Sequence, residues 1–427
     1  MNSYFSFLRL GYSRVVYFAI TFSLLFISTN VLSQDIYLER IYSPLIKTVK
    51  LEVTGTDFTI PIIKLGSSDR LLLKFDELSE ETKRYGYKII HCNSDWTKSE
   101  LQAFEYIQGF ETGYIENYAN SFNTLQRYVH YWHEFPNNIM EFKLSGNYII
   151  KVYLDDNPDN VVMVRRFMVL EDDANIRLNV MNARNPSDIR TKQELDVFVS
   201  PKNNMSFANP SIYLKVFVQQ NGNRDLHLLT HRQIKSTEIE YSFKDENIFE
   251  AGNEFRNFDF SSLRTRTRNV SNIDFINGEN HIRLFPDKPR ANIAYMSHND
   301  IDGYYYIRSD NAYDFNIESD YAWVHFYLPV PIDLEGSYYI WGELSDWNFS
   351  TQNKMEYSKE YNSYYSKLYL KQGFYDYMIM YKSNQSSTLS SSKIEGNYSE
   401  TNNKYNIYVY YRKPGDSFDS LIGFLRK

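Results

Sequence analysis

Short runs in which apolar and polar residues alternate recur along most of this chain. Residues 146–154 read GNYIIKVYL, with apolar side chains at every second position from Tyr148 to Leu154. Because successive residues of a strand point to opposite faces of a sheet, this spacing predicts a strand with one apolar face. The turn-rich residues 155–160, DDNPDN, separate it from a second apolar run at 161–170, and the two runs predict a β-hairpin.

Runs of this kind group into three blocks, at residues 34–171, 172–316 and 317–427. The first block opens with IKTVKLEV and closes with the hairpin. The second contains NIRLNV, ELDVFVSP, IYLKVFVQQNG and IEYSFKDENIF, and the third contains WVHFYLP, GSYYIWGEL, YYSKLYL, GFYDYMIMYK and KYNIYVYYRKPG. Short strands separated by frequent turn signals are typical of β-sandwiches. We therefore expect an all-β fold of tandem Ig-like or early-set β-sandwich domains, one for each block, without long helices.

The amino end has the order of features found in a signal peptide. Arg9 and Arg14 precede the apolar stretch VVYFAITFSLLFI, and small residues follow it. This order predicts a signal peptide at residues 1–33 with cleavage after Ser33, so that no membrane span remains in the mature chain. A retained membrane anchor is the alternative.

Composition and charge limit the classes of molecule that this chain could bind. The chain has 427 residues, of which 43% are hydrophobic and 17% aromatic, enough material for several packed cores. Cleavage would remove two of the 46 basic residues and no acid, which leaves 44 basic residues against 53 acids and a formal net charge of −9. An acidic chain argues against a nucleic-acid partner, because phosphates require a basic surface. Cys92 is the only cysteine, so no intramolecular disulfide can form, and it is best interpreted as a small buried residue.

The motifs of common catalytic and metal sites do not occur in the sequence. Asp155, Asn157 and Asp159 have the spacing of an EF-hand calcium loop, but Asn160 replaces the turn glycine and Arg166 replaces the closing carboxylate. A hairpin turn is therefore the better interpretation. The eight histidines are scattered, and there is no H-E-x-x-H, C-x-x-C, G-x-S-x-G, P-loop or dinucleotide motif. We expect no metal, no cofactor and no enzyme activity, although an envelope hydrolase with carboxylates on distant strands leaves no spacing in sequence.

The third block contains one candidate binding residue. Its segments YYIWGELSDWN and YYSKLYLKQGFYDYMIMY resemble early-set Ig-like domains that include the glycogen-binding modules. Trp347 could stack on a sugar ring, as exposed aromatic faces do in carbohydrate sites. The second tryptophan of those modules is missing, because the corresponding region reads KSNQSSTLSSS. A packing role for Trp347 is therefore favoured, and a periplasmic carbohydrate-binding β-sandwich protein is kept as the alternative function.

The stretch EAGNEFRNFDFSSLRTRTRNV, residues 250–270, combines charges with aromatic residues. Glu254 and Arg256 alternate with phenylalanines, which suggests a fixed ion pair at a domain junction or a docking ridge. Arg264, Arg266 and Arg268 occupy every second position and would share one face of an extended segment. A solvated basic face is the simpler interpretation, and a contact surface for a partner is the more specific one.

Taken with EFPNNIMEFKLSGNYIIKVYLDD and IEGNYSETNNKYNIYVYYRKPGDSFDSLIG, this stretch resembles the Plug protein family of the Bacteroidetes type IX secretion system. The resemblance covers the chain from about residue 35 to its carboxyl end and makes the first block the Plug amino-terminal domain. It implies a non-enzymatic periplasmic protein associated with the outer membrane. Such a protein closes the periplasmic opening of the giant outer-membrane β-barrel translocon. The resemblance also makes residues 250–270 a family signature with a structural or docking role.

Overall fold

The computed structural model describes residues 38–202, 205–222, 224–386 and 389–427, and the signal peptide expected at residues 1–33 lies outside them. Strands make up 47% of the structure and helices 5%, which confirms the all-β fold. The α-helices of the described part have four residues each: α2 (Ala103–Tyr106), α3 (Pro210–Tyr213) and α4 (Phe315–Glu318). None of the described helices combines the length and the apolar character that crossing a membrane requires.

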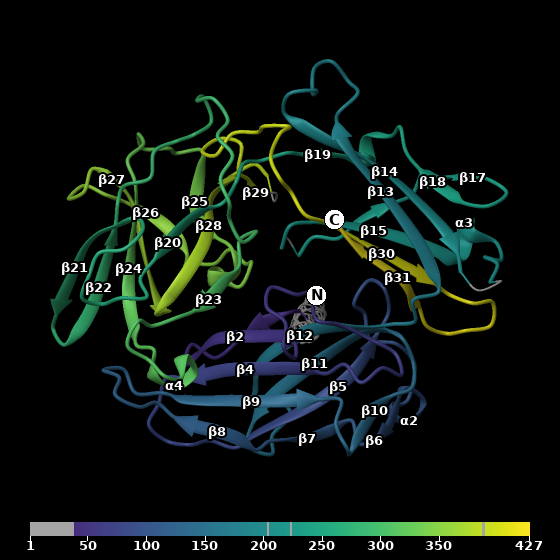
Figure 1. The fold of residues 1–427 in the computed structure, drawn as a ribbon, viewed down its shortest axis with the longest axis horizontal. Coiled ribbons are helices and arrows are strands. Elements are labelled where there is room, and N and C mark those ends of the chain that lie inside the picture. The colour runs from purple at the N-terminus through teal and green to yellow at the C-terminus, as the bar shows by residue number, and fades with distance from the viewer. Residues whose placement is uncertain (1–37, 203–204, 223, 387–388) are drawn as a thin grey trace, which may run out of the picture. The chain divides into compact units, whose positions relative to one another are not determined.

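The first domain packs two sheets around one core (Figure 1). One sheet has the order β1 (Arg40–Ile41), β12 (Val161–Leu170), β11 (Gly146–Leu154), β5 (Tyr85–Cys92) and β7 (Thr112–Ile115), with β3 (Ile62–Lys64) parallel to β12. The other has the order β2 (Ile46–Val53), β4 (Leu71–Glu77), β9 (Val129–Phe135) and β8 (Asn117–Asn120). A small sheet joins β6 (Ile107–Gly109) to β10 (Met140–Phe142). Aromatic rings fill the core, where Phe75 and Tyr131 stack with centroids 5.2 Å apart.

The second domain also consists of two sheets around a shared core. One has the order β13 (Ala174–Asn182), β14 (Lys192–Pro201), β18 (Ile239–Tyr241) and β17 (Gln233–Ile234), with β19 (Ile248–Glu250) beside β14. The other has the order β16 (His227–Leu229), β15 (Leu214–Gln220), β30 (Tyr405–Tyr411) and β31 (Ser420–Arg426). The last two strands of the chain therefore complete a domain that begins at about residue 174.

The third domain is one continuous ten-stranded sheet around its own core. Its main path is β20 (Arg256–Asp259), β28 (Gly373–Ser383), β25 (Gly336–Trp341), β26 (Lys354–Ser358), β27 (Ser363–Lys371), β24 (Tyr321–Leu328), β22 (Glu279–Leu284) and β21 (Val270–Ile276). Two short strands, β23 (Tyr305–Ile307) and β29 (Leu389–Ser390), pair with β28. Figure 1 shows β21 at the outer edge of this sheet, beside β22.

The sheets follow a different division from the three expected blocks. Strands β20 to β23, before residue 317, join the sheet of the third domain, and β30 and β31 pair with the second domain. From these sheets and cores we infer that the third domain is inserted into the second, between about residues 251 and 404. Sequence periodicity locates strands but not their partners, so it placed the boundary at residues 316 and 317.

The predicted hairpin at the end of the first block is confirmed, since β11 pairs with β12 in antiparallel register. Tyr148, Ile150 and Val152 face the core of the first domain, as expected. Ile149 and Tyr153 on the opposite face are also buried, and β31 of the second domain packs against β11. The alternating pattern thus identified one buried face but did not indicate that the other face is buried as well.

Candidate functional site

A carboxylate of the third domain binds arginines of the other two. Oδ1 of Asp346 lies 3.0 Å from Nη2 of Arg165 and 2.8 Å from Nη2 of Arg224. Arg165 is on β12, Arg224 follows β15, and Asp346 follows the 3-10 turn η3 (Glu343–Ser345). Glu39 lies 3.5 Å from Nε of Arg224. Burial would lower the pKa of Arg224, but the charges of Asp346 and Glu39 outweigh it and raise the pKa, so the guanidinium stays charged.

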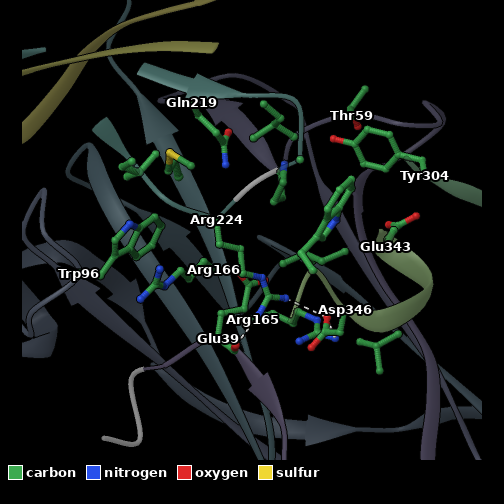
Figure 2. A pocket seen from close by; sticks show the side chains of 18 of the residues that line it. Glu39, Thr59, Trp96, Arg165, Arg166, Gln219, Arg224, Tyr304, Glu343 and Asp346 are labelled. Atoms are coloured by element: carbon green, nitrogen blue, oxygen red, sulfur yellow. Dashed lines mark hydrogen bonds and ion pairs between the residues drawn. The ribbon is translucent and has the colours of Figure 1, made fainter. Parts of the chain in front are cut away.

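The cavity at this junction has a volume of about 150 Å³. Figure 2 shows Arg165 and Arg224 pointing toward Asp346, with Glu39 close by. The guanidinium of Arg166 lies over the ring of Trp96, 4.5 Å from its centroid. The lining contains three arginines and three carboxylates, so the cavity presents no excess of one charge to a ligand. Its arrangement fits a junction that fastens three domains together.

Trp347 belongs to the same junction and is partly buried there. Its ring lies 4.7 Å from that of Trp341 and 5.8 Å from that of Tyr304. A Cβ atom built on Gly222 of the second domain would lie 2.1 Å from the indole, so the backbone there closes directly over the ring. These contacts with neighbouring rings and backbone fit the packing role favoured from the sequence.

A second buried cluster joins the first domain to the third. Asp76 on β4 accepts hydrogen bonds from Nζ of Lys371, at 2.6 Å, and from the hydroxyl of Tyr321, at 2.7 Å. Its other oxygen lies 2.6 Å from Nδ1 of His130. Burial would raise the pKa of Asp76, but the charges of Lys371 and His130 outweigh it and hold the pKa below its usual value. Lys371 also lies over the ring of Tyr128, 4.2 Å from the centroid.

A third cluster joins the first domain to the second through Asp419. Its carboxylate accepts hydrogen bonds from the backbone and hydroxyl of Ser94, at 3.1 and 2.7 Å. Lys215 and Arg412 also donate to it, at 3.0 and 2.9 Å. Burial would raise the pKa of Asp419, but these hydrogen bonds lower it to about 2. The carboxylate is therefore ionised at neutral pH and holds the two domains together.

Glu254 and Arg256 are both largely buried, and they do not form the ion pair expected between them. Arg256 pairs with Asp287, at 3.0 Å, and with Glu395, at 2.9 Å. Glu254 accepts instead from the hydroxyl of Tyr295. The expectation failed because alternation along β20 places neighbouring charges near each other but does not select their partners. Both charges are satisfied inside the protein and act structurally.

Arg264, Arg266 and Arg268 lie in the irregular loop between β20 and β21, which we call the arginine loop, residues 263–269. The expected extended segment is therefore wrong, although all three side chains are exposed. Thr267 fixes the loop by donating to the carbonyl of Asp259. Within the described part of the chain, none of the three guanidinium groups forms an ion pair with a carboxylate.

The calcium-like spacing at residues 155–160 forms a turn. Oδ1 of Asn157 accepts from the backbone of Asp159 at 3.1 Å, and Asp155 adopts a positive φ of 56°. In the residues that the structure describes, no group of three or more His, Cys, Asp or Glu side chains could hold a metal ion. The hairpin-turn interpretation agrees with this geometry.

Sequence analysis did not identify the junction residues Asp76, Asp346, Lys371 and Asp419. A weak signal exists for two of them. Asp76 and Lys371 are charged residues within the strand runs LLLKFDE and SYYSKLYLK, where a charge on a buried position requires a partner. The partner lies on another domain in both cases, so no spacing within one run could reveal it.

Comparison with known proteins identifies a related family and a related crystal structure. The profile of the type 9 secretion system plug protein first domain matches residues 46–171, which are most of the first domain. The crystal structure of a hypothetical protein from Parabacteroides merdae is 35% identical in sequence, with a TM-score of 0.88. The alignment covers 91% of this chain and 98% of that one, so the arrangement of all three domains has a counterpart there.

A comparison with curated proteins gave no match. The match over residues 46–171 identifies a family of structural components of secretion, which suggests an envelope location. Residues 46–171 of this chain therefore match the first domain of the type 9 secretion system plug protein family, the family that the sequence segments resemble.

Proposed function

We propose that this protein closes the periplasmic opening of the giant outer-membrane β-barrel translocon of the type IX secretion system. The family match over residues 46–171 is the observation that carries the proposal. A pore that passes folded proteins would leak small molecules when empty, so its plug must be a folded body that keeps its shape. The protein would act in the periplasm, after removal of a signal peptide at residues 1–33.

The contacts between domains support this function. Residues 39–427 form one compact unit, in which Asp76 and Asp346 each bind a cation across a domain boundary. Asp419 accepts hydrogen bonds from Ser94 across another boundary. Breaking such a buried pair costs about 3–5 kcal/mol, because an unpaired buried charge remains. These two ion pairs and the hydrogen bonds between Ser94 and Asp419 oppose bending between the domains. The structure thus supplies a stiff, three-domain body.

The arginine loop is the surface we assign to contact with the translocon. Its three exposed cations contrast with the formal net charge of −7 of the whole chain. A polar interface of this kind suits a plug that must come away when a substrate arrives, since reversible interfaces are smaller and more polar than obligate ones. Glu254 and Arg256 lie at the start of β20, before this loop in the chain, and contact Tyr295 and Glu395 inside the protein. They are not part of the proposed contact.

Deletion of the gene tests the sealing role. Cells without the protein should admit large antibiotics that the outer membrane normally excludes, and the leak should disappear when the translocon barrel is also deleted. Co-purification with the barrel from solubilised outer membranes tests the association itself. Unchanged permeability after deletion would contradict the sealing role, and absence from the barrel fraction would contradict the association.

The carbohydrate-binding alternative depended on Trp347. Because this ring packs against Trp341, Tyr304 and the backbone of Gly222, a packing role is favoured over sugar stacking. No other observation favours that function.

A further inference from the structure

The edge strand β21 is a second feature of the surface that carries the arginine loop. It is the terminal strand of the third domain's sheet, and among the described residues it pairs with β22 alone. A terminal strand presents unpaired N–H and C=O groups, which an extended segment of another chain can complete as an added strand.

The turn of the β21–β22 hairpin determines which backbone groups face outward. Asn277 and Gly278 have φ values of 52° and 87° and form a two-residue turn between Ile276 and Glu279. In such a hairpin the flanking residues exchange both hydrogen bonds, and bonded and non-bonded pairs then alternate. Ile276 is thus bonded to β22, whereas the backbone groups of Phe275 and Ile273 point away from it.

Side chains at this edge are open to a partner. Phe275 is 64% exposed and Ile276 is 38% exposed, so an added strand would cover apolar surface at the tip of the hairpin. Ile273, in contrast, packs against the core of the third domain and anchors the strand. Packing of Ile273 against the core therefore holds β21 in place, while the outward backbone groups of β21 pair with no other strand among the described residues.

The arginine loop leads directly into this edge. Nη1 of Arg266 donates to the carbonyl oxygen of Ser271 at 3.2 Å, which places one guanidinium against the beginning of β21. Arg264 and Arg268 are exposed in the same loop. A segment lying along β21 would pass these cations, and carboxylates on it would form charge-assisted hydrogen bonds with them.

From this juxtaposition we propose that β21 binds an extended, carboxylate-bearing segment of a partner protein as an added strand, with the arginine loop selecting its charge. The proposal rests on the proposed function only for the partner's identity, a component of the secretion system. Backbone pairing supplies the register of the added strand, and the arginines discriminate against neutral or basic segments.

Binding of labelled peptides to the purified protein tests this edge without the barrel. The probes are eight-residue fluorescent peptides in which Thr alternates with Glu, Gln or Lys. The Glu peptide should bind at least about tenfold more tightly than the Gln peptide, because charge-assisted hydrogen bonds are lost in the latter. The Lys peptide should bind most weakly. Equal affinity for the Glu and Gln peptides would overturn the proposal.

Phe275→Pro removes the outward N–H while leaving the ladder to β22 intact, and Phe275→Ala removes the same side chain but keeps the N–H. The proline variant should bind the Glu peptide about five- to tenfold more weakly, and the alanine variant should lose less than about threefold. Unchanged binding by Phe275→Pro would contradict strand addition.

Hydrogen exchange on the unmodified protein is an independent measurement in case the proline variant misfolds. The Glu peptide should slow exchange within residues 271–276, and the Gln peptide at the same concentration should not. Absence of that protection at saturating peptide would overturn the proposal. If the protein co-purifies with the barrel but binds no peptide, this inference alone is contradicted. If it binds the Glu peptide but does not co-purify with the barrel, the plug function alone is contradicted.

Discussion

Asp346 and Arg165 are an ion pair between two domains, with Oδ1 of the aspartate 3.0 Å from Nη2 of the arginine. The arginine side chain is 5% exposed, and the same carboxylate oxygen also binds Arg224 of the second domain. One carboxylate thus holds all three domains, which makes it the most informative position at which to test their rigidity.

Replacing Asp346 with Asn leaves two guanidinium groups without their shared countercharge. We expect the free energy of unfolding to fall by about 3–5 kcal/mol, the usual result of breaking a buried ion pair from one side. Urea unfolding followed by tryptophan fluorescence measures the loss. Asp310→Asn is the matched control, because Asp310 is 41% exposed and, among the described residues, its ion pair is with the surface residue Arg308. Equal stability of the two variants would show that the junction does not fasten the domains.

Asp76 and Lys371 should be energetically coupled across the first and third domains. Lys371→Met leaves a carboxylate buried beside His130, and Asp76→Asn leaves a buried ammonium group. Each single change should cost about 3 kcal/mol or more. The double variant should lose clearly less than the sum, because neither charge is then unpaired. A double-mutant cycle in urea measures the coupling, and additive losses would contradict a direct interaction.

Asp376 should make stability depend on pH. Burial raises the pKa of this carboxyl to about 8, and its Oδ1 has no hydrogen-bond partner among the described residues. Since the folded pKa lies above the unfolded value of 3.8, its favourable contribution is complete below about pH 4 and is lost as pH rises toward 8.

Asp376→Asn keeps an acceptor for the backbone N–H groups of Ile301 and Gly303 but cannot ionise. The variant should match the parent near pH 4 and exceed its unfolding free energy by up to about 5 kcal/mol at pH 8. Melting curves from pH 4 to pH 8 test this, with Asp310→Asn as the control expected to follow the parent. A constant difference between Asp376→Asn and the parent across that range would exclude ionisation of Asp376 as the cause.

Trp347→Ala should weaken the fold and leave glucan retention unchanged. Removing a packed indole beside Trp341 creates a cavity at the junction and should cost about 3–5 kcal/mol. Thermal unfolding measures the first effect, and an affinity gel containing a glucan tests the second. Retention of the parent protein in the gel, abolished in the variant, would restore the carbohydrate-binding function.

Replacing Arg264, Arg266 and Arg268 together with Gln should weaken co-purification with the translocon and make the remainder less sensitive to salt. The unfolding free energy should change by less than about 1 kcal/mol, because all three side chains are exposed. Pull-downs at low and high salt measure the effect. Replacing the exposed Lys359 and Lys413 with Gln provides a control for surface charge elsewhere. If the triple change leaves the association unaltered, the arginine loop is a solvated face and not a contact surface.

The sequence by itself determined the local structure. The alternation of apolar and polar residues located β2, β11, β12 and the main strands of the later blocks. A strand with one buried face has an apolar residue at every second position, which gives the sequence a period of two. The turn at DDNPDN followed from its residues, since Asp and Asn tolerate the positive φ seen at Asp155. The exposure of Arg264, Arg266 and Arg268 was also expected, because unpaired cations stay in water.

Only the tertiary structure decided which strands share a sheet and which charges meet. The pairing of β15 with β30 inserts one domain into another, and no period along the chain encodes that choice. Asp346 meets Arg165 and Arg224, and Arg256 meets Glu395 rather than its neighbour Glu254, through contacts between distant segments. A short-range pattern records how each residue is buried, whereas a buried charge is stabilised by whichever opposite charge the completed fold brings within reach.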